Sequence, residues 1–505
     1  MKISGRTYHD LTSYDRHRIA GHALDWGTQP DPFKRYCGLE TVELPQPMDG
    51  PDEPLSAVIQ RATADYSDVE MDLERLSRLL WSTHAITART KHGGAYFHYR
   101  SVASAGALYP FECYLAAHGI RGLDDGLFHH AVQSQSLTRL RSGDTGAMVA
   151  KTVGISPDTE PTVVFFLTAV FFRSSWKYRD RAYRYHLLDT GHLAENLSLA
   201  CSATGLRFRM TYDFNDDAAG EFLGLDSERE ACLAVAMAWG RTREAERSCA
   251  PPSSLPIGVK EACKVSDREF EYPAILEIHR ASEMKKLPPE PLKPMTDRLG
   301  LDLGQGTPMV SEPVWPEVLT YSESVFGRRS RRNYTQRPLD GKTFQALVGS
   351  LAAGGSSKDK EGHPEAAFVA VGFIAHGLES LANGFYVLDT VRGIIHKTTV
   401  RPTTENMADI CLNQAWLARC SLHFVFMADL RFLDEAYGPR GYRYAMLTAG
   451  RLGQRLYLTA TSLGLGCCGI GAFYDVEAAL YLGLAPDARL LYLVAAGPVK
   501  KPVTG

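Results

Sequence analysis

The amino-acid sequence predicts an α+β fold made of two tandem domains of one architecture, each with a central antiparallel or mixed sheet flanked by helices. Three observations lead to this prediction: the length of 505 residues, one segment that occurs twice, and apolar runs that flank both copies of it. A chain of this length is too long for a single core, because domains typically hold roughly 100–200 residues.

The repeated segment carries the most weight. Arg181–Leu206 matches Arg440–Leu465 without a gap, and 11 of the 26 aligned positions are identical, among them Gly191 and its counterpart Gly450. The length and the unbroken apolar spacing predict a buried helix in each copy.

Strand-like runs accompany each copy of the helix. One apolar run precedes it, at Thr162–Phe171 and Ser421–Ala428, and another follows it, at Ala231–Trp239 and Leu490–Ala496. Runs of this length, rich in apolar and aromatic residues, predict buried strands. The order strand, long helix, strand therefore occurs twice, as tandem duplication predicts.

The domain boundaries follow from the repeat and from a stretch between the copies that is rich in proline and glycine. Two homologous domains on a long connector can pack as the subunits of a homodimer do, so we expect an intramolecular pseudo-dimer. Before the first domain, Trp26 and Pro30–Tyr36 are open to two interpretations, a lid or a peptide clamp. We expect an N-terminal extension over residues 1–55, a first domain over 56–250, a connector over 251–315 and a second domain over 316–505.

Composition narrows the class of protein. The content of 45% hydrophobic and 22% charged residues is that of a globular protein, and the net charge of -3 offers no bulk attraction to nucleic acid or to an anionic membrane. No window holds the roughly 18 apolar residues of a membrane span, and Met1–Arg16 lacks the apolar core of a signal peptide. We expect a cytoplasmic protein.

Cys467 and Cys468 are adjacent and the histidines lack ligand spacing, so no metal is expected.

A cluster of arginines is the first candidate binding motif. Arg328 and Arg332 flank Ser330 in the segment Ser324–Tyr334. Guanidinium groups bind phosphate oxygens through paired hydrogen bonds, and a serine hydroxyl adds a donor, so the cluster favours a phosphate-bearing ligand. A solvated basic turn, or a proteolytic or RNA-binding patch, explains the spacing equally well.

Two segments of small residues follow as candidates. Val102–Pro110 places Ser104 and Gly106 among alanines, which lets a flat ligand approach the backbone or, alternatively, starts a tightly packed helix. Gly464–Phe473 has four glycines that can turn main-chain N–H groups toward a ring, although a plain loop is an equal alternative.

A lysine and a tyrosine stand side by side just before the first copy of the helix. Lys177 and Tyr178 can serve as an acid–base pair if they are partly desolvated. Such a dipeptide is also common by chance.

Taken together, these segments resemble the nitroreductase family. VASAGALYP at 102–110 and WKYRDRAYRYHLLDTGH at 176–192 are most similar to its SagB-type dehydrogenase branch. The resemblance implies FMN-binding α+β proteins in which two subunits share each flavin. It also implies a role for each motif. Arg328, Ser330 and Arg332 hold the flavin phosphate, and Ser104, Ala105 and Gly106 contact the flavin from the partner domain. Gly471 and Ala472 supply amides toward its N5 side, and Gly469 also binds the cofactor. Asn413 and Gln414 contact the ring or the ribityl chain, and Lys177 and Tyr178 are catalytic.

The two halves depart from this pattern in complementary ways. The first-half positions equivalent to Arg328, Ser330 and Arg332 hold Gln60, Ala62 and Ala64, which cannot neutralise a phosphate. The second half has Ala436 where the first has Lys177, and Lys360–Ala367 in place of Val102–Pro110. The surviving elements add up to one composite site, so we expect one FMN per chain.

The function that the resemblance implies is an FMN-dependent oxidoreductase with hydride transfer at flavin N5. SagB-like dehydrogenation of azoline rings in a modified peptide is the first hypothesis. The alternatives are an NAD(P)H-dependent nitro- or quinone-type reductase and a non-catalytic flavin- or peptide-binding scaffold. The expected partners are a small-molecule or modified-peptide substrate and, in the reductase alternative, NAD(P)H; further oligomerisation stays open.

Overall fold

The computed structural model describes residues 3–19, 21–46, 50, 52–61, 69–92, 95–156, 161–242, 248, 250–284, 294–352 and 365–500. The chain divides into two compact units. Ala23–Pro51 and Ala64–Leu287 form the first-repeat unit, and Met1–His22, Asp52–Thr63 and Pro288–Gly505 form the second-repeat unit.

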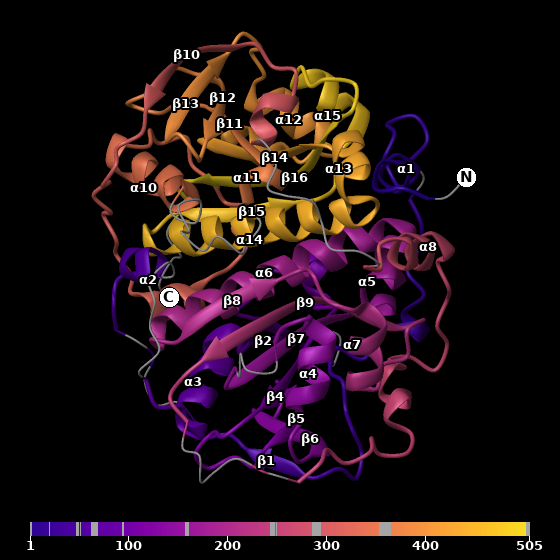
Figure 1. Ribbon diagram of the computed structural model, residues 1–505. Helices are drawn as coiled ribbons and strands as arrows, with labels where there is room; N and C mark the ends of the chain where they lie inside the picture. Colours follow the sequence, from indigo (N-terminus) through magenta and orange to yellow (C-terminus); the bar gives the residue numbers. More distant parts are fainter. Residues whose placement is uncertain are drawn as a thin grey trace. The chain divides into compact units, whose positions relative to one another are not determined.

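The first-repeat unit is built on a seven-stranded sheet in the order β1-β6-β5-β4-β7-β9-β8, in which every neighbouring pair is antiparallel. The strands β2 and β3 form a separate antiparallel hairpin (Figure 1). The strands are β1 (Thr41–Glu43), β2 (Ile86–His92), β3 (Ala95–Arg100), β4 (Phe111–Ala117), β5 (Gly126–Ala131), β6 (Ser136–Ser142), β7 (Val163–Val170), β8 (Arg207–Thr211) and β9 (Glu230–Trp239).

The second-repeat unit has a seven-stranded antiparallel sheet of its own, in the order β10-β13-β12-β11-β14-β16-β15. If the strands of each sheet are numbered along the chain, the two sheets have the same spatial order of strands. This agreement confirms the predicted tandem repeat. The strands are β10 (Leu303–Pro308), β11 (Ala370–Ala375), β12 (Gly384–Asp389), β13 (Ile394–Thr398), β14 (Leu422–Asp429), β15 (Gly466–Ile470) and β16 (Ala488–Gly497).

The repeated segment is the long helix of each unit, as predicted. It forms α6 (Ala182–Ala203) in the first unit and α14 (Arg440–Ser462), yellow in Figure 1, in the second. Nearly every residue of both helices is buried, including charged residues such as Arg184 and Arg443. The helix α6 packs on α3 (Leu73–Thr83) and on its own sheet, and α14 packs on α10 (Gly341–Ala352) and on β15 and β16.

Both faces of the first sheet are covered, because side chains alternate along each strand. On β4, Cys113 and Leu115 join the core cluster that contains Leu193 of α6. Tyr114, between them, joins the opposite cluster with Phe222. The sheet therefore lies in the middle of its unit, with helices on both sides.

Short helices follow equivalent strands in the two units. The helix α5 (Phe171–Tyr178) comes directly after β7, and α13 (Leu430–Tyr437) comes directly after β14. The other α-helices are α1 (Gly5–Leu11), α2 (Leu55–Arg61), α4 (Gly146–Val153), α7 (Asp216–Leu223), α8 (Pro273–Ala281), α9 (Tyr321–Gly327), α11 (Glu365–Phe368), α12 (Thr404–Ile410) and α15 (Asp475–Tyr481). The 3₁₀ helices are η1 (Trp26–Thr28), η2 (Ala105–Ala107), η4 (Arg179–Arg181), η6 (Val259–Cys263), η7 (Met295–Arg298) and η8 (Ala415–Arg419).

The predicted connector (251–315) and the start of the predicted first domain carry secondary structure that is divided between the two units. The helix α8 and the 3₁₀ helix η6 belong to the first-repeat unit, whereas β10 is the outermost strand of the second sheet. The helix α2 belongs to the second-repeat unit and packs on α14 and α9. Over the part of the chain that the structure describes, no helix is long and apolar enough to cross a membrane.

Candidate functional site

The predicted phosphate motif lies just after α9, whose first turn is closed by a capping box between Thr320 and Glu323. Arg328 is buried, and its guanidinium carbon lies 5.4 Å from the centre of the Tyr457 ring on α14. The Ser330 hydroxyl is 2.9 Å from the Tyr457 hydroxyl, which also accepts a 2.7 Å hydrogen bond from the Gly469 amide. Tyr457 therefore joins the arginine segment to the glycine segment.

Tyr457 is a residue that the sequence analysis missed. A signal was present, because the aligned position of the first repeat holds Ser198. A large aromatic residue thus occurs only in the copy that keeps the arginines. Burial raises the pKa of Tyr457 well above its ordinary value, so its hydroxyl is neutral.

A plain loop was one of the two alternatives for the glycine segment Gly464–Phe473, and the structure does not form it. The centre of the segment is the strand β15, paired with β16. The Arg331 amide donates 2.9 Å to the Cys467 carbonyl and so fixes the arginine segment beside this strand. A Cβ at Gly469 would stand 1.7 Å from the Tyr492 hydroxyl, so that glycine is required by packing. Gly471 and Ala472 follow the strand in irregular, half-buried backbone.

Arg332 lies against an aromatic pair. Its guanidinium carbon is 5.8 Å from the Trp416 ring, and Trp416 stacks on Tyr334 with centroids 5.9 Å apart and planes at 12°. These residues help to line a cavity of about 250 Å³. Burial raises the pKa of the Cys468 thiol, although Arg332 beside it acts in the opposite direction. The thiol is therefore neutral and unlike a reactive thiolate.

Asn413 and Gln414 precede this aromatic pair. Asn413 is exposed and has a positive φ of 57°, a backbone conformation that asparagine tolerates better than most residues. Gln414 donates from Nε2 to the Cys411 carbonyl at 2.8 Å, so part of its hydrogen-bonding capacity stabilises its own turn.

The counterpart of the phosphate motif in the first half has no comparable cluster in the described residues. Gln60 is exposed on α2, and Arg61 beside it donates to Glu53 at 3.0 Å. Ala62 and Ala64, like most of Lys360–Ala367, lie outside the described residues.

In the first-repeat unit, the small-residue segment is held by a buried carboxyl group. The Ser104 hydroxyl donates to Asp189 Oδ2 at 2.6 Å, and the Ala105 amide lies 3.2 Å from both carboxyl oxygens. The Tyr109 amide donates to Ser104 Oγ at 2.9 Å. The segment forms the 3₁₀ helix η2 and not the start of an α-helix.

Gly106, Lys177 and Tyr178 lie together. Gly106 has a φ of 64°, and an added Cβ there would stand 2.7 Å from the Tyr178 hydroxyl and 3.2 Å from Lys177 Nζ. The Tyr178 ring packs on Tyr185 with centroids 4.4 Å apart. The lysine and the tyrosine predicted to be catalytic are thus adjacent to the glycine predicted to contact the flavin. Both helices α5 and α13 have eight residues, and Ala436 occupies the place of Lys177 in the second.

Asp189 is the second residue that sequence reasoning missed. Burial raises its pKa to about 7, although the hydrogen bonds from Ser104 and Ala105 act in the opposite direction. The aligned residue of the second repeat is Thr448, in the copy that lacks the small-residue segment. That difference between the copies was visible in the sequence.

These observations define an α+β fold that occurs twice in the chain, with the arginine cluster in one copy and the lysine–tyrosine pair in the other. The family model described as the nitroreductase family matches residues 61–241 and 325–498. The chain belongs to the nitroreductase family, in tandem form, and is an oxidoreductase of that family.

Three relatives illustrate the match. A putative nitroreductase of Methanocaldococcus jannaschii, MJ1384, is 26% identical over 170 residues, which are 32% of this chain and 80% of that protein. The microcin B17-processing protein McbC of Escherichia coli is 27% identical over 142 residues, 27% of this chain and 52% of McbC. A putative nitroreductase from Anabaena variabilis, known from a crystal structure, is 26% identical to this chain. The match covers 98% of this chain and 100% of that chain, with a TM-score of 0.78.

Proposed function

We propose that the chain binds one FMN and works as an FMN-dependent oxidoreductase. The observation that carries the proposal is the division of the motifs between the repeats: the arginine cluster around Tyr457 in the second, and the Gly106, Lys177 and Tyr178 cluster in the first. The assignment of both clusters to one flavin rests on the sequence, in which each repeat lacks the motifs that the other repeat keeps.

The residues of the arginine cluster fit a phosphate dianion. Arg328 supplies a guanidinium group and Ser330, whose side chain is exposed, supplies a hydroxyl, and both groups bind phosphate oxygens well. Arg332 adds a second guanidinium beside an aromatic ring. We therefore assign the flavin phosphate to Arg328, Ser330 and Arg332. Gly469, Gly471, Ala472, Asn413 and Gln414 are proposed contacts of the rest of the cofactor.

Lys177 and Tyr178 are the proposed proton-handling groups. A bound FMN supplies hydride transfer at its N5 atom. The neutral amine of Lys177 or the phenolate of Tyr178 would take up the proton that leaves the substrate together with the hydride. Ser104, Ala105 and Gly106 bring the backbone close to the flavin, and Asp189 keeps that segment in place.

The substrate that we propose is an azoline ring in a modified peptide. Oxidation to the aromatic azole removes two hydrogens, one as hydride and one as a proton, and so needs a proton acceptor such as the Lys177 and Tyr178 pair. The similarity to McbC, a microcin-processing protein, supports this choice. An NAD(P)H-dependent nitro- or quinone-type reductase is the second candidate, which the relatives described as nitroreductases favour.

Counting FMN tests the cofactor proposal. We expect the purified protein to carry one FMN per chain by absorbance, and the Arg328→Ala/Arg332→Ala variant to lose it. Arg337→Ala removes an exposed arginine just beyond this segment and is the matched control, which should keep its FMN. Two FMN per chain would show that the degenerate site also binds, and none would favour the non-catalytic scaffold.

Turnover separates the two reactions. We expect Lys177→Ala to abolish oxidation of a thiazoline peptide while FMN content stays at one per chain. If the wild type reduces a nitroaromatic or a quinone with NAD(P)H, and never oxidises the thiazoline, the reductase is the correct assignment.

A further inference from the structure

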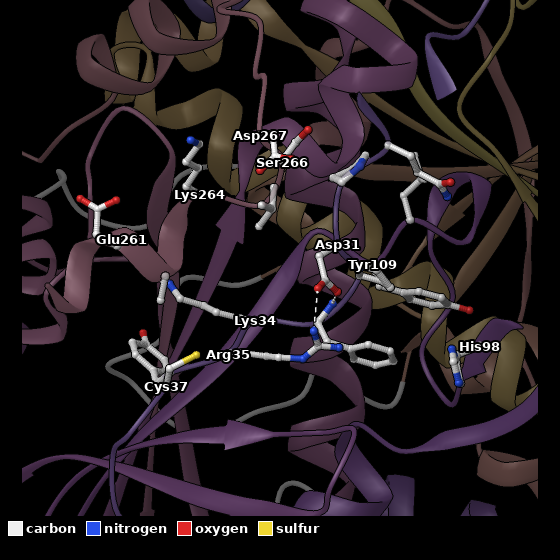
Figure 2. A pocket seen from close by; sticks show the side chains of 18 of the residues that line it. Asp31, Lys34, Arg35, Cys37, His98, Tyr109, Glu261, Lys264, Ser266 and Asp267 are labelled. Carbon is white, nitrogen blue, oxygen red and sulfur yellow. Dashed lines mark hydrogen bonds and ion pairs between the residues drawn. The ribbon is translucent and has the colours of Figure 1, made fainter. Parts of the chain in front are cut away.

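The first-repeat unit contains a cavity of about 1090 Å³, whose lining shares Gly106 with the proposed flavin contacts (Figure 2). In that view, Glu261 and Cys37 lie at one end and His98 at the other. Its walls come from four stretches: residues from 27 to 39, residues 96–100 of β3, residues 106–109, and residues from 256 to 267.

Two of these walls lie outside the residues that the family model matches. The family match begins at residue 61 and its first part ends at 241, so the walls from 27 to 39 and from 256 to 267 lie outside it and are called the added walls below. The third wall includes Gly106, which is also the neighbour of Lys177 and Tyr178. The added segments therefore create a binding space next to the candidate catalytic pair.

The N-terminal wall is fixed in place by buried cations. Arg100, of which 1% is exposed, donates to the Pro32 carbonyl at 2.6 Å, and Arg173, fully buried, donates to the Asp31 carbonyl at 3.0 Å. The Asp31 amide donates to Val265 of the opposite added wall at 2.7 Å. Lys34 forms a buried ion pair with Glu230 on β9. A wall held in this way is preformed, which lowers the entropic cost of binding a ligand.

The size and lining of the cavity suit a polypeptide. Pockets for drug-sized ligands hold roughly 300–1,000 Å³, so a single quinone or nitroaromatic ring would leave most of this space empty. The lining combines exposed aromatic side chains, Tyr96 and Phe97, with charges of both signs. One such pair is Asp31 and Arg35, 3.1 Å apart (Figure 2). Glu261, Lys264 and Asp267 add charges from the other added wall.

We propose that this cavity binds the stretch of peptide next to the reacting ring, so that the added walls select the substrate of the Lys177 and Tyr178 site. The proposal rests on the proposed function and adds the surface that recognises the peptide. The segment Pro30–Tyr36 is then one side of a peptide clamp and not a lid.

The test compares two phenylalanines of the same unit. Phe97 lines this cavity and is 40% exposed, and Phe270 lines a different cavity and is 47% exposed. A pool of decapeptides, each with one thiazoline and random flanking residues, is panned on the immobilised full chain, and the enriched peptide is resynthesised with a fluorescein label. We expect Tyr96→Ala/Phe97→Ala to weaken its binding about tenfold by anisotropy, and Phe270→Ala to change it less than twofold.

The outcomes separate this proposal from the proposed function. Failure of any peptide to be enriched, or equal binding by both variants, overturns the peptide cavity even if FMN is bound. Peptide binding that depends on Tyr96 and Phe97, in a protein without FMN or thiazoline oxidation, supports the cavity and overturns the enzyme assignment. Protection of residues 96–100 and 256–267 from hydrogen exchange by the peptide supports the cavity as well.

Discussion

The Ser104 hydroxyl donates a 2.6 Å hydrogen bond to the carboxyl group of Asp189, which is buried on α6. The same hydroxyl accepts from the Tyr109 amide, and the Ala105 amide also points to this carboxyl group. Asp189 thus holds the start of the turn that contains Gly106, and Ser104 holds the end of the turn at Tyr109. The turn stands beside Lys177 and Tyr178, so the state of Asp189 affects the candidate catalytic pair through the backbone.

Asp189→Asn should make stability less dependent on pH. The folded-state pKa of Asp189, raised to about 7 by burial, exceeds its ordinary value of 3.8. Between these two values the folded protein holds a proton that the unfolded chain releases. The stability that this proton contributes is therefore complete below about pH 4 and is lost as the pH rises through about 7. Thermal melts from pH 5 to 8 should fall more steeply for the wild type than for Asp189→Asn.

Asp189→Ala provides the comparison for that experiment. It leaves the Ala105 amide and the Ser104 hydroxyl without their acceptor and should lower stability by about 1–3 kcal/mol at every pH. Parallel melting curves for the wild type and Asp189→Asn would show that the carboxyl group does not titrate in this range.

Gly106→Ala should reduce turnover more than it reduces stability. Alanine at a positive φ costs about 1 kcal/mol, and here its Cβ would also collide with the Tyr178 hydroxyl and displace it. Gly154→Ala is the matched control, since Gly154 has a φ of 72° in the same unit but open space around an added Cβ. Both variants should melt a few degrees lower, and only Gly106→Ala should lose most of its thiazoline turnover. Equal activity of the two would remove Gly106 from the site.

The long helices and central strands were predictable because their signals are local. A buried strand needs a continuous apolar stretch, and the predicted run Thr162–Phe171 extends beyond β7 (Val163–Val170) by only one residue at each end. The duplication was predictable because β7, α5, α6 and β8 align with β14, α13, α14 and β15 without a gap.

The strand β15 was not predictable in this way. Its sequence, GCCGI, has low strand propensity, and its conformation comes from pairing with β16 and from the close approach of Tyr492 and Val499 to its glycines. The three-residue strand β1 is too short for a periodic signal.

The candidate site was predictable where a motif is contiguous and not where tertiary contacts create it. The Arg328 to Arg332 segment and the Lys177 and Tyr178 pair were found by type and order. Asp189 and Tyr457 each contact a segment more than 80 residues away in sequence, at separations of 85 from Ser104 and 127 from Ser330. Only the fold brings them to those partners.

Lys34→Met should destabilise the first-repeat unit strongly. Burial opposes both charges of its ion pair, yet Glu230 raises the pKa of Lys34 and Lys34 lowers the pKa of Glu230, so the pair is ionised. Removing the lysine leaves a buried carboxylate without a counter-charge, which costs about 3–5 kcal/mol. The exposed pair Arg431 and Glu435 is the control, and Arg431→Met should cost less than about 1 kcal/mol. Similar melting temperatures for the two variants would contradict the role of the buried pair.

Tyr457→Phe should weaken FMN binding without unfolding the second-repeat unit. Its hydroxyl bridges Ser330 Oγ, at 2.9 Å, and the Gly469 amide, at 2.7 Å, so its loss frees both the arginine segment and β15 from a shared partner. A lost hydrogen bond of this kind is worth about 1 kcal/mol, or about a fivefold weaker Kd. Tyr386→Phe is the matched control, because that hydroxyl donates to the Ala382 carbonyl at 2.8 Å in the same unit. Fluorescence titration with FMN should show the weakening for Tyr457→Phe alone, and equal Kd values would mean that Tyr457 only packs against Arg328.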